Sequence, residues 1–326
     1  MGLIATMGGW LAPKTLGETE RAVIEHVVDR VDPRLRVVSG YQRKLVPAVR
    51  RALDYCTALV ADIPGPVEID VRTFGNDPLV HAFFAAPQDI GRMLGTSREV
   101  AKFVALPDTR RADDFYALIG MRRKEKTVVG PALQGDFIRE GVPQRLLYFA
   151  DHTLRELSLD VAETRHGLRA SAVDSLAGSF ALHLDALRRE KTDIHTAWEQ
   201  ERALARSVAA QAATEAEAHE HRRFEIEEGL REIASSLEPA HVLDALSAWL
   251  ADPEPRLYLV PVSVSVDRLG VLSQPAPDNP EVRTLSFPEL VGRDRRRWIV
   301  LLARISRADA LHAQEEYGEA NRYLII

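Results

Sequence analysis

Apolar residues near the start of the chain recur every three or four positions, the spacing of a helix that buries one face. Residues 18–31 and 42–63 both follow this pattern and predict two amphipathic helices. Shorter helices are expected within 79–106, where Ser97 stands at an N-cap position. The first third of the chain is therefore partly helical.

Alternation of apolar and polar residues predicts strands in other segments. In 67–74, apolar residues alternate with charged ones, which indicates a strand with one solvated face. The segments 126–133 and 145–149 flank turn residues and predict an antiparallel pair. Three more strands are predicted near the C-terminus, at 257–266, 283–287 and 298–305.

The middle of the chain contains an unusually long stretch without helix-breaking residues. Fifty consecutive residues between Gly178 and Gly229 include neither glycine nor proline. This composition predicts a long helical region over about 160–235. A single straight helix through the glycine-free run would measure about 75 Å, which exceeds the width of a small domain. We therefore expect it to cross the body, join two bodies or pair with a second chain.

A heptad register placed on Leu184 gives this region a coiled-coil character. Ten of the sixteen a and d positions that follow from this register are apolar. No large apolar residue occurs between Val208 and Phe224, so this part is expected to be a solvated rod. The apolar part predicts a seam for self-association, formed by Phe180, Leu184, Leu187, Ile194 and Trp198.

These patterns together predict an α+β protein with three segments. A mixed domain (1–150) precedes a long helical, coiled-coil-like region (151–252) and a small antiparallel β-rich domain (253–326). The first segment carries 21 Lys and Arg against 18 Asp and Glu, the second 11 against 20, and the third 10 against 10. The acidic middle argues against a nucleic-acid surface along the chain.

The cysteine content and the apolar stretches indicate the cellular compartment. The single cysteine, Cys56, excludes an internal disulfide and lies in an apolar run, which indicates a buried, unreactive thiol. No stretch approaches the roughly 18 apolar residues that span a bilayer. The first 15 residues do not read as a secretory signal. The sequence therefore predicts a cytoplasmic protein without membrane association.

The sequence contains no motif that identifies a catalytic or cofactor site. It has no glycine-rich nucleotide loop, no nucleophile elbow and no H-E-x-x-H zinc motif. The pair Glu163 and His166, and the ladder Glu217, His221 and Glu225, have helical ligand spacing. The pair would need a second E-x-x-H motif on the following helix, and none occurs there. A solvated charged face explains the ladder better than a metal does, because no apolar shell surrounds it. No cofactor, metal or catalytic residue is predicted.

Clustered arginines give one candidate binding site in a turn between the last two predicted strands. Such clusters bind phosphates or acidic partners. They also occur in ordinary solvated loops, and this cluster could instead dock on the acidic helix of the same chain around Glu225. The anion- or partner-binding candidates are Arg293, Arg295, Arg296 and Arg297.

The interpretation favoured by these patterns is a cytoplasmic structural or adaptor protein that self-associates through its long helix and can bind a protein partner. One alternative is a regulatory module that senses an anionic ligand. The other is an enzyme of unrecognised type, although the sequence leans away from catalysis.

Overall fold

The computed structural model describes residues 18–134, 137–208, 213–267, 269–273, 282–292 and 296–320. They form two compact units, each built from two stretches of chain. The helical unit comprises 18–54 and Leu176–Pro253, and the sheet unit comprises Tyr55–Ser175 and 254–320. The protein is of the α+β class, as predicted, but its units are not the contiguous segments expected from sequence. The N-terminal stretch considered for targeting lies outside the described residues.

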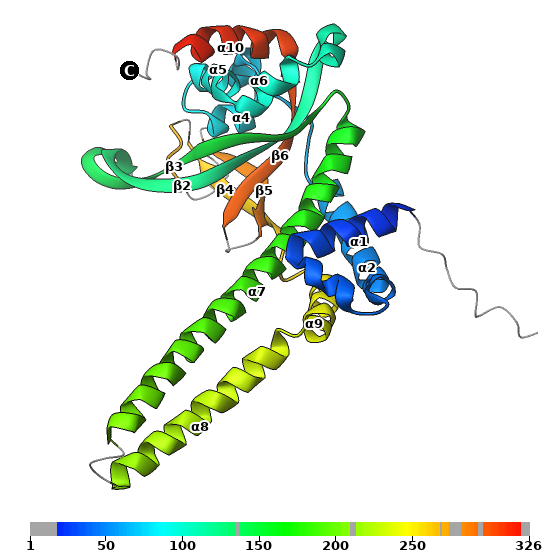
Figure 1. Ribbon diagram of the computed structural model, residues 1–326. Helices are drawn as coiled ribbons and strands as arrows, with labels where there is room; N and C mark the ends of the chain where they lie inside the picture. The colour runs from blue at the N-terminus through cyan, green and yellow to red at the C-terminus, as the bar shows by residue number, and fades with distance from the viewer. Residues whose placement is uncertain are drawn as a thin grey trace, which may run out of the picture. The chain divides into compact units, whose positions relative to one another are not determined.

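The helical unit is built from amphipathic helices that bury their apolar faces together (Figure 1). Buried residues include Val27, Leu45, Phe180 and Leu243. The helices at the start of the chain and the long helix were predicted. The elements are α1 (Glu18–Val31), the 3-10 helix η1 (Pro33–Val37), α2 (Tyr41–Ala61) up to residue 54, α7 (Val161–Val208) from residue 176, α8 (Ala213–Ser236) and α9 (Pro239–Ala251).

The glycine-free run is divided between α7 and α8 instead of forming one straight rod. Figure 1 shows α8 running back alongside α7 in the opposite direction. Side chains of Trp198 and Glu201 on α7 contact residues of α8, which fixes the pairing. From the length of the run we expected it to cross the body, join two bodies or pair with a second chain. The observed arrangement, a helical hairpin within the chain, was not among these alternatives. Residues 209–212, where the predicted solvated rod begins, lie outside the described residues.

The sheet unit holds one six-stranded sheet in the order β3-β2-β6-β5-β4, with β1 paired in parallel to β6. All other pairings are antiparallel. Strands predicted in the first and last thirds of the chain thus share one sheet. The strands are β1 (Val67–Glu68), β2 (Asp114–Gln134), β3 (Phe137–Ser158), β4 (Tyr258–Val266), β5 (Arg283–Val291) and β6 (Arg297–Ser306).

Strand β6 is buried on both faces because helices cover both sides of the sheet at its centre. Leu301 and Ile305 belong to the larger core, to which the short helices contribute. Val300 and Leu302 face the opposite side and cluster with Leu168 of α7. The short helices are α3 (Val71–Asn76), α4 (Pro78–Phe83), α5 (Pro87–Thr96), α6 (Arg98–Val104), the 3-10 helix η2 (Pro107–Arg111) and α10 (Arg307–Ala320).

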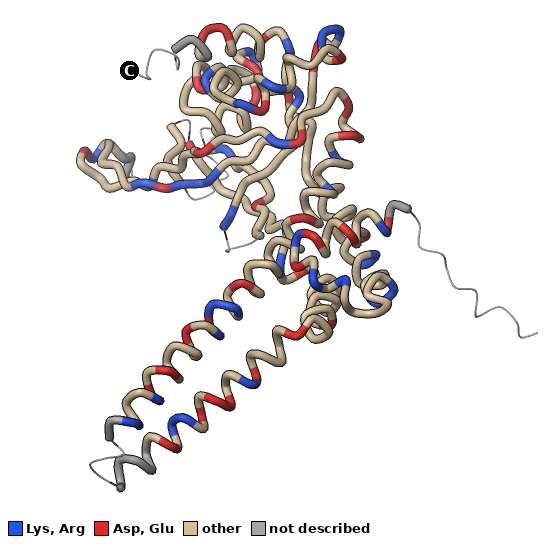
Figure 2. The backbone as a smooth tube through the Cα atoms, viewed as in Figure 1, with Lys and Arg blue, Asp and Glu red and all other residues tan. Residues whose placement is uncertain are grey.

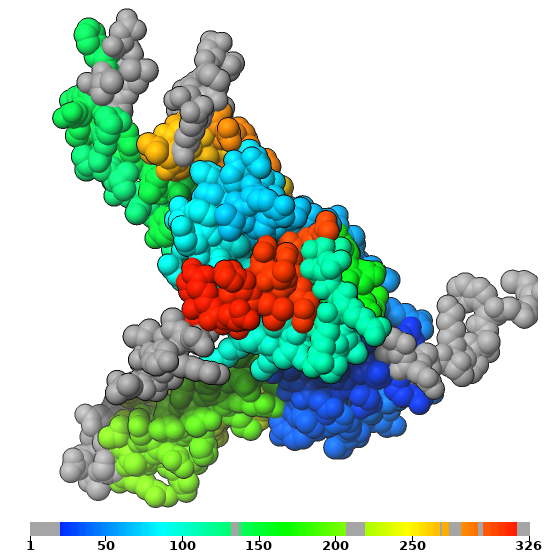
Figure 3. Space-filling model, turned by 90° about the horizontal axis from the view of Figure 1, so that it is seen from above, coloured from blue at the N-terminus to red at the C-terminus, as the bar shows by residue number. Residues whose placement is uncertain are grey.

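Helix α10 packs closely on α5 and α6, where Figure 3 shows it in red against the cyan helices. A Cβ atom added to Gly95 would lie 2.3 Å from the carbonyl oxygen of Ala313. Such a distance is a hard clash, so only glycine permits this approach. The side chain of Gln314 also donates to the carbonyl oxygen of Ser97 at 3.2 Å.

Strands β2 and β3 extend beyond the rest of the sheet as a two-stranded ribbon (Figures 1 and 3). Pairing of β2 with β6 ends at Met121, whereas its pairing with β3 continues to Gln134. The predicted antiparallel pair is confirmed and is longer than expected.

The predicted strand 67–74 is wrong beyond its second residue. Strand β1 ends at Glu68, and α3 begins at Val71. The Asp70 side chain accepts a hydrogen bond from the backbone N–H of Thr73 at 2.6 Å, and the Thr73 hydroxyl accepts one from the backbone N–H of Asp70. This capping box stabilises the start of a helix and overrides the alternation of apolar residues.

Candidate functional site

The candidate site is the hairpin formed by residues 176–208 of α7 and by α8, here called the α7–α8 hairpin. The two arms differ in charge, as Figure 2 shows. Residues 176–208 carry five acidic and five basic residues, whereas Ala213–Ser236 carries seven acidic and three basic residues. The hairpin is therefore acidic mainly along α8.

Polar side chains hold the two arms together. The indole N–H of Trp198 donates to Oε1 of Glu227 at 3.1 Å. Glu201 is almost buried and contacts Nδ1 of His219, and Nε of Arg222 lies 3.7 Å from the same carboxylate oxygen. Glu201, His219 and Arg222 occupy a and d positions of the predicted heptad register. The register thus identifies the inner face of the hairpin, including the positions where polar residues interrupt its apolar pattern.

The predicted seam residues fall into two groups. Phe180 and Leu184 are buried within the helical unit, and the Phe180 ring lies 5.5 Å from the Trp249 ring on α9. Leu187, Ile194 and Trp198 are only partly buried. The part of the hairpin far from α9 therefore keeps apolar surface that its own unit does not cover.

Two large apolar side chains of the hairpin are mostly exposed. Leu204 on α7 exposes 53% of its surface, and Phe224 on α8 exposes 57%. Neither belongs to the predicted seam, because both occupy other heptad positions. The sequence marks these two residues only as a Leu and a Phe at outward-facing positions of helices whose outer faces are otherwise polar.

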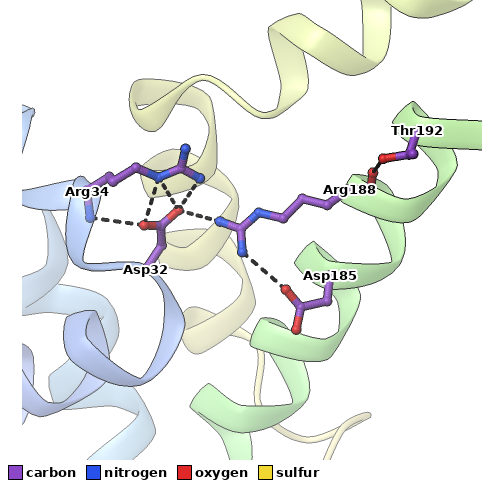
Figure 4. A network of polar contacts seen from close by, with 5 residues as sticks. All are labelled: Asp32, Arg34, Asp185, Arg188 and Thr192. Carbon is purple, nitrogen blue, oxygen red and sulfur yellow. Dashed lines mark hydrogen bonds and ion pairs between the residues drawn. The ribbon is translucent and has the colours of Figure 1, made fainter. Parts of the chain in front are cut away.

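A polar network fixes the base of the hairpin to η1 (Figure 4). The buried Asp32 carboxylate accepts hydrogen bonds from the backbone and guanidinium of Arg34 and, at 2.5 Å, from Nη2 of Arg188 on α7. Nη1 of Arg188 also donates to Asp185 at 3.1 Å, and the Thr192 hydroxyl donates to the Arg188 carbonyl oxygen at 3.0 Å. Burial acts to raise the pKa of Asp32, but the Arg34 hydrogen bonds and the Arg188 charge outweigh it and lower that pKa.

The arginine candidates lie in the sheet unit and are described only in part. Arg293 and Arg295 lie outside the described residues, and Arg296 is exposed. Arg297 donates to Oε2 of Glu289 at 3.2 Å, and Nε of Arg123 lies 3.0 Å from the other carboxylate oxygen. The Glu289 side chain is only 2% exposed. Arg297 thus neutralises a buried carboxylate, which the sequence pattern did not indicate.

The metal candidates considered from sequence do not assemble into a ligand set in the described part of the chain. No group of three or more His, Cys, Asp or Glu side chains is placed there to hold an ion. His166 is hydrogen-bonded to Arg169, and His221 lies 3.4 Å from Glu225 on an exposed helix face. The side chain of Glu217 lies outside the described residues. Among the described helices, none has the length and apolarity that crossing a bilayer requires.

Comparison of the chain with models of known protein families, with curated proteins and with solved structures finds no match.

Proposed function

We propose that this protein is a cytoplasmic adaptor that assembles with a second copy of itself through the outer surface of the α7–α8 hairpin. The observation that carries the proposal is the exposure of Leu204 and Phe224 on a hairpin whose arms are joined by polar contacts of Trp198 and Glu201. Two helices alone cannot bury both sides of an apolar seam, and pairing of two hairpins into a four-helix bundle solves this problem.

The charges of the two arms are compatible with a second copy of the chain bound to the hairpin, and they favour one relative orientation of the two hairpins. The α8 arm has a net charge of −4 from seven acidic and three basic residues, whereas the 176–208 arm is balanced. Two α8 arms side by side would repel each other. An arrangement in which α8 of each copy lies against α7 of the other avoids this repulsion.

Substitution of the exposed apolar residues tests the proposal. The double variant Leu204→Glu, Phe224→Glu should be a monomer, because burial of each side chain at an interface contributes about 1.5–3 kcal/mol and a carboxylate there would lose solvation. Sedimentation equilibrium measures the mass. The helical content should stay at the wild-type level in circular dichroism, since neither side chain is buried in the single chain.

A matched control places the same charge on another exposed apolar residue of the helical unit. Val37 in η1 is 81% exposed, and Val37→Glu should leave the mass unchanged. If Val37→Glu dissociates the protein as effectively as the double variant, the effect is one of net charge and the hairpin surface is not the interface.

A further inference from the structure

A cleft of about 580 Å³ lies within the sheet unit, where β3, the adjoining ends of β4 and β5, and the turn from α3 to α4 meet. Its volume is in the range of small-molecule sites. It is independent of the proposed assembly, because every residue that lines it belongs to the sheet unit.

The inner wall of the cleft is apolar and rigidly held. Phe84, Phe149 and Leu285 line it, and all three are nearly buried in the main core of the sheet unit. The Phe149 ring also packs edge-on against Phe83 and Phe287. A ligand with an apolar body would therefore meet a preformed surface, with little side-chain ordering required.

The carboxylates at the rim are already engaged by hydrogen bonds from the backbone. Asp77 accepts hydrogen bonds from two backbone N–H groups of α4, at 2.7 and 3.3 Å. Asp267 accepts two from the turn that follows it, at 2.8 and 2.9 Å. Because both carboxylates serve as local caps, they are poor partners for a cationic ligand.

Among the remaining polar residues that line the cleft, Arg283 has the charge that suits an anion. Arg283 is exposed at the start of β5, and no ion pair engages it within the described ranges. Nδ1 of His81 lies 3.2 Å from the Phe74 carbonyl oxygen, which assigns the proton to Nδ1.

We propose that this cleft binds a small amphipathic anion, with its carboxylate or sulfonate held by Arg283 and its apolar body on Phe84, Phe149 and Leu285. An arginine fork matches the two oxygens of a carboxylate. A ligand of this class has one charge and an apolar body of about ten carbon atoms, in keeping with the size of the cleft.

Fluorescence titration with two probes of similar size tests the proposal on the full chain. The anionic dye 8-anilinonaphthalene-1-sulfonate should bind with one site per chain, and decanoate should displace it. The neutral dye N-phenyl-1-naphthylamine reports the apolar wall without the charge. Arg283→Gln should weaken the binding of the anionic dye about tenfold, which corresponds to about 1.4 kcal/mol, and should leave the neutral dye unaffected. Arg283→Lys should recover part of the loss.

Two further variants keep the test decisive. Arg110→Gln removes an exposed arginine of η2 outside the cleft and should change neither affinity. Ala85→Trp places a large side chain at the exposed rim of the cleft and should weaken both dyes. The proposal would be overturned if Arg283→Gln and Arg110→Gln had equal effects, or if the anionic dye showed no saturable binding. It would also be overturned if the protein bound anionic phospholipid vesicles and decanoate failed to displace the anionic dye.

Discussion

The hydrogen bond between Arg188 and Asp32 fixes the base of the hairpin, and its contribution to stability can be estimated. A hydrogen bond to a charged group contributes about 1.5–3 kcal/mol. The Arg188 side chain is 35% exposed and the Asp32 side chain 9% exposed. Partial solvent screening lowers the expected coupling to about 1–2 kcal/mol.

A double-mutant cycle with Arg188→Met and Asp32→Asn measures this coupling. Methionine keeps most of the length of the arginine stem, and asparagine keeps an oxygen that can accept from the Arg34 backbone N–H. We expect Asp32→Asn to cost about 2–3 kcal/mol, because it removes a paired charge that is nearly buried. Arg188→Met should lower the free energy of unfolding by less, because Asp32 keeps its ion pair with Arg34 and the Asp185 carboxylate is solvated. Urea denaturation followed by circular dichroism gives the free energies of unfolding.

The pH dependence has a defined sign. The pKa of Asp32 is lowered in the folded protein, so its contribution is complete above the unfolded value of about 3.9. The contribution is lost as the pH falls through the lower folded value. A coupling energy below about 0.5 kcal/mol at pH 7 would refute the reasoning, because pairs that do not interact are additive within that margin.

Three further predictions concern the sheet unit. Burial raises the pKa of the Cys56 thiol to about 12, so iodoacetamide at pH 8 should modify it only when the protein is unfolded in urea; rapid native labelling would show an accessible thiol. Burial lowers the pKa of His152 despite its hydrogen bond to the Phe83 carbonyl oxygen, so the free energy of unfolding should fall as the pH drops below about 6.5. This fall should be smaller in His152→Gln than in the control variant His312→Gln. Gly95→Ala should lower the free energy of unfolding by about 1–3 kcal/mol, because the new methyl group meets the Ala313 carbonyl oxygen; an unchanged melting temperature would contradict the close approach of α5 and α10.

The sequence predicted most helices because their signals are local. The apolar spacing of residues 18–31 and the absence of glycine and proline after Gly178 depend only on neighbouring positions. The N-cap at Ser97 is confirmed by its 3.2 Å hydrogen bond from the Val100 backbone N–H. Similar local reasoning failed at 67–74, where the capping signal of Asp70 and Thr73 outweighed the alternation.

Features that depend on distant residues could not be predicted. The pairing of β2 with β6 joins residues almost two hundred positions apart, and periodicity carries no information about it. The chain reversal between α7 and α8 follows no turn signal, since the residues around it are mostly alanine. Glu201 and His219 become partners only once the arms lie side by side. The cleft is likewise formed by four separate stretches of chain, so no single motif marks it.

Assembly of two copies through the hairpin is the central claim, and the mass of the unmodified chain in solution tests it most directly. The single chain has a mass of 36.3 kDa. Light scattering coupled to size-exclusion chromatography should give twice that value at micromolar concentration, with dissociation only on dilution. A mass equal to that of one chain at every concentration, up to the solubility limit, would contradict the proposed assembly.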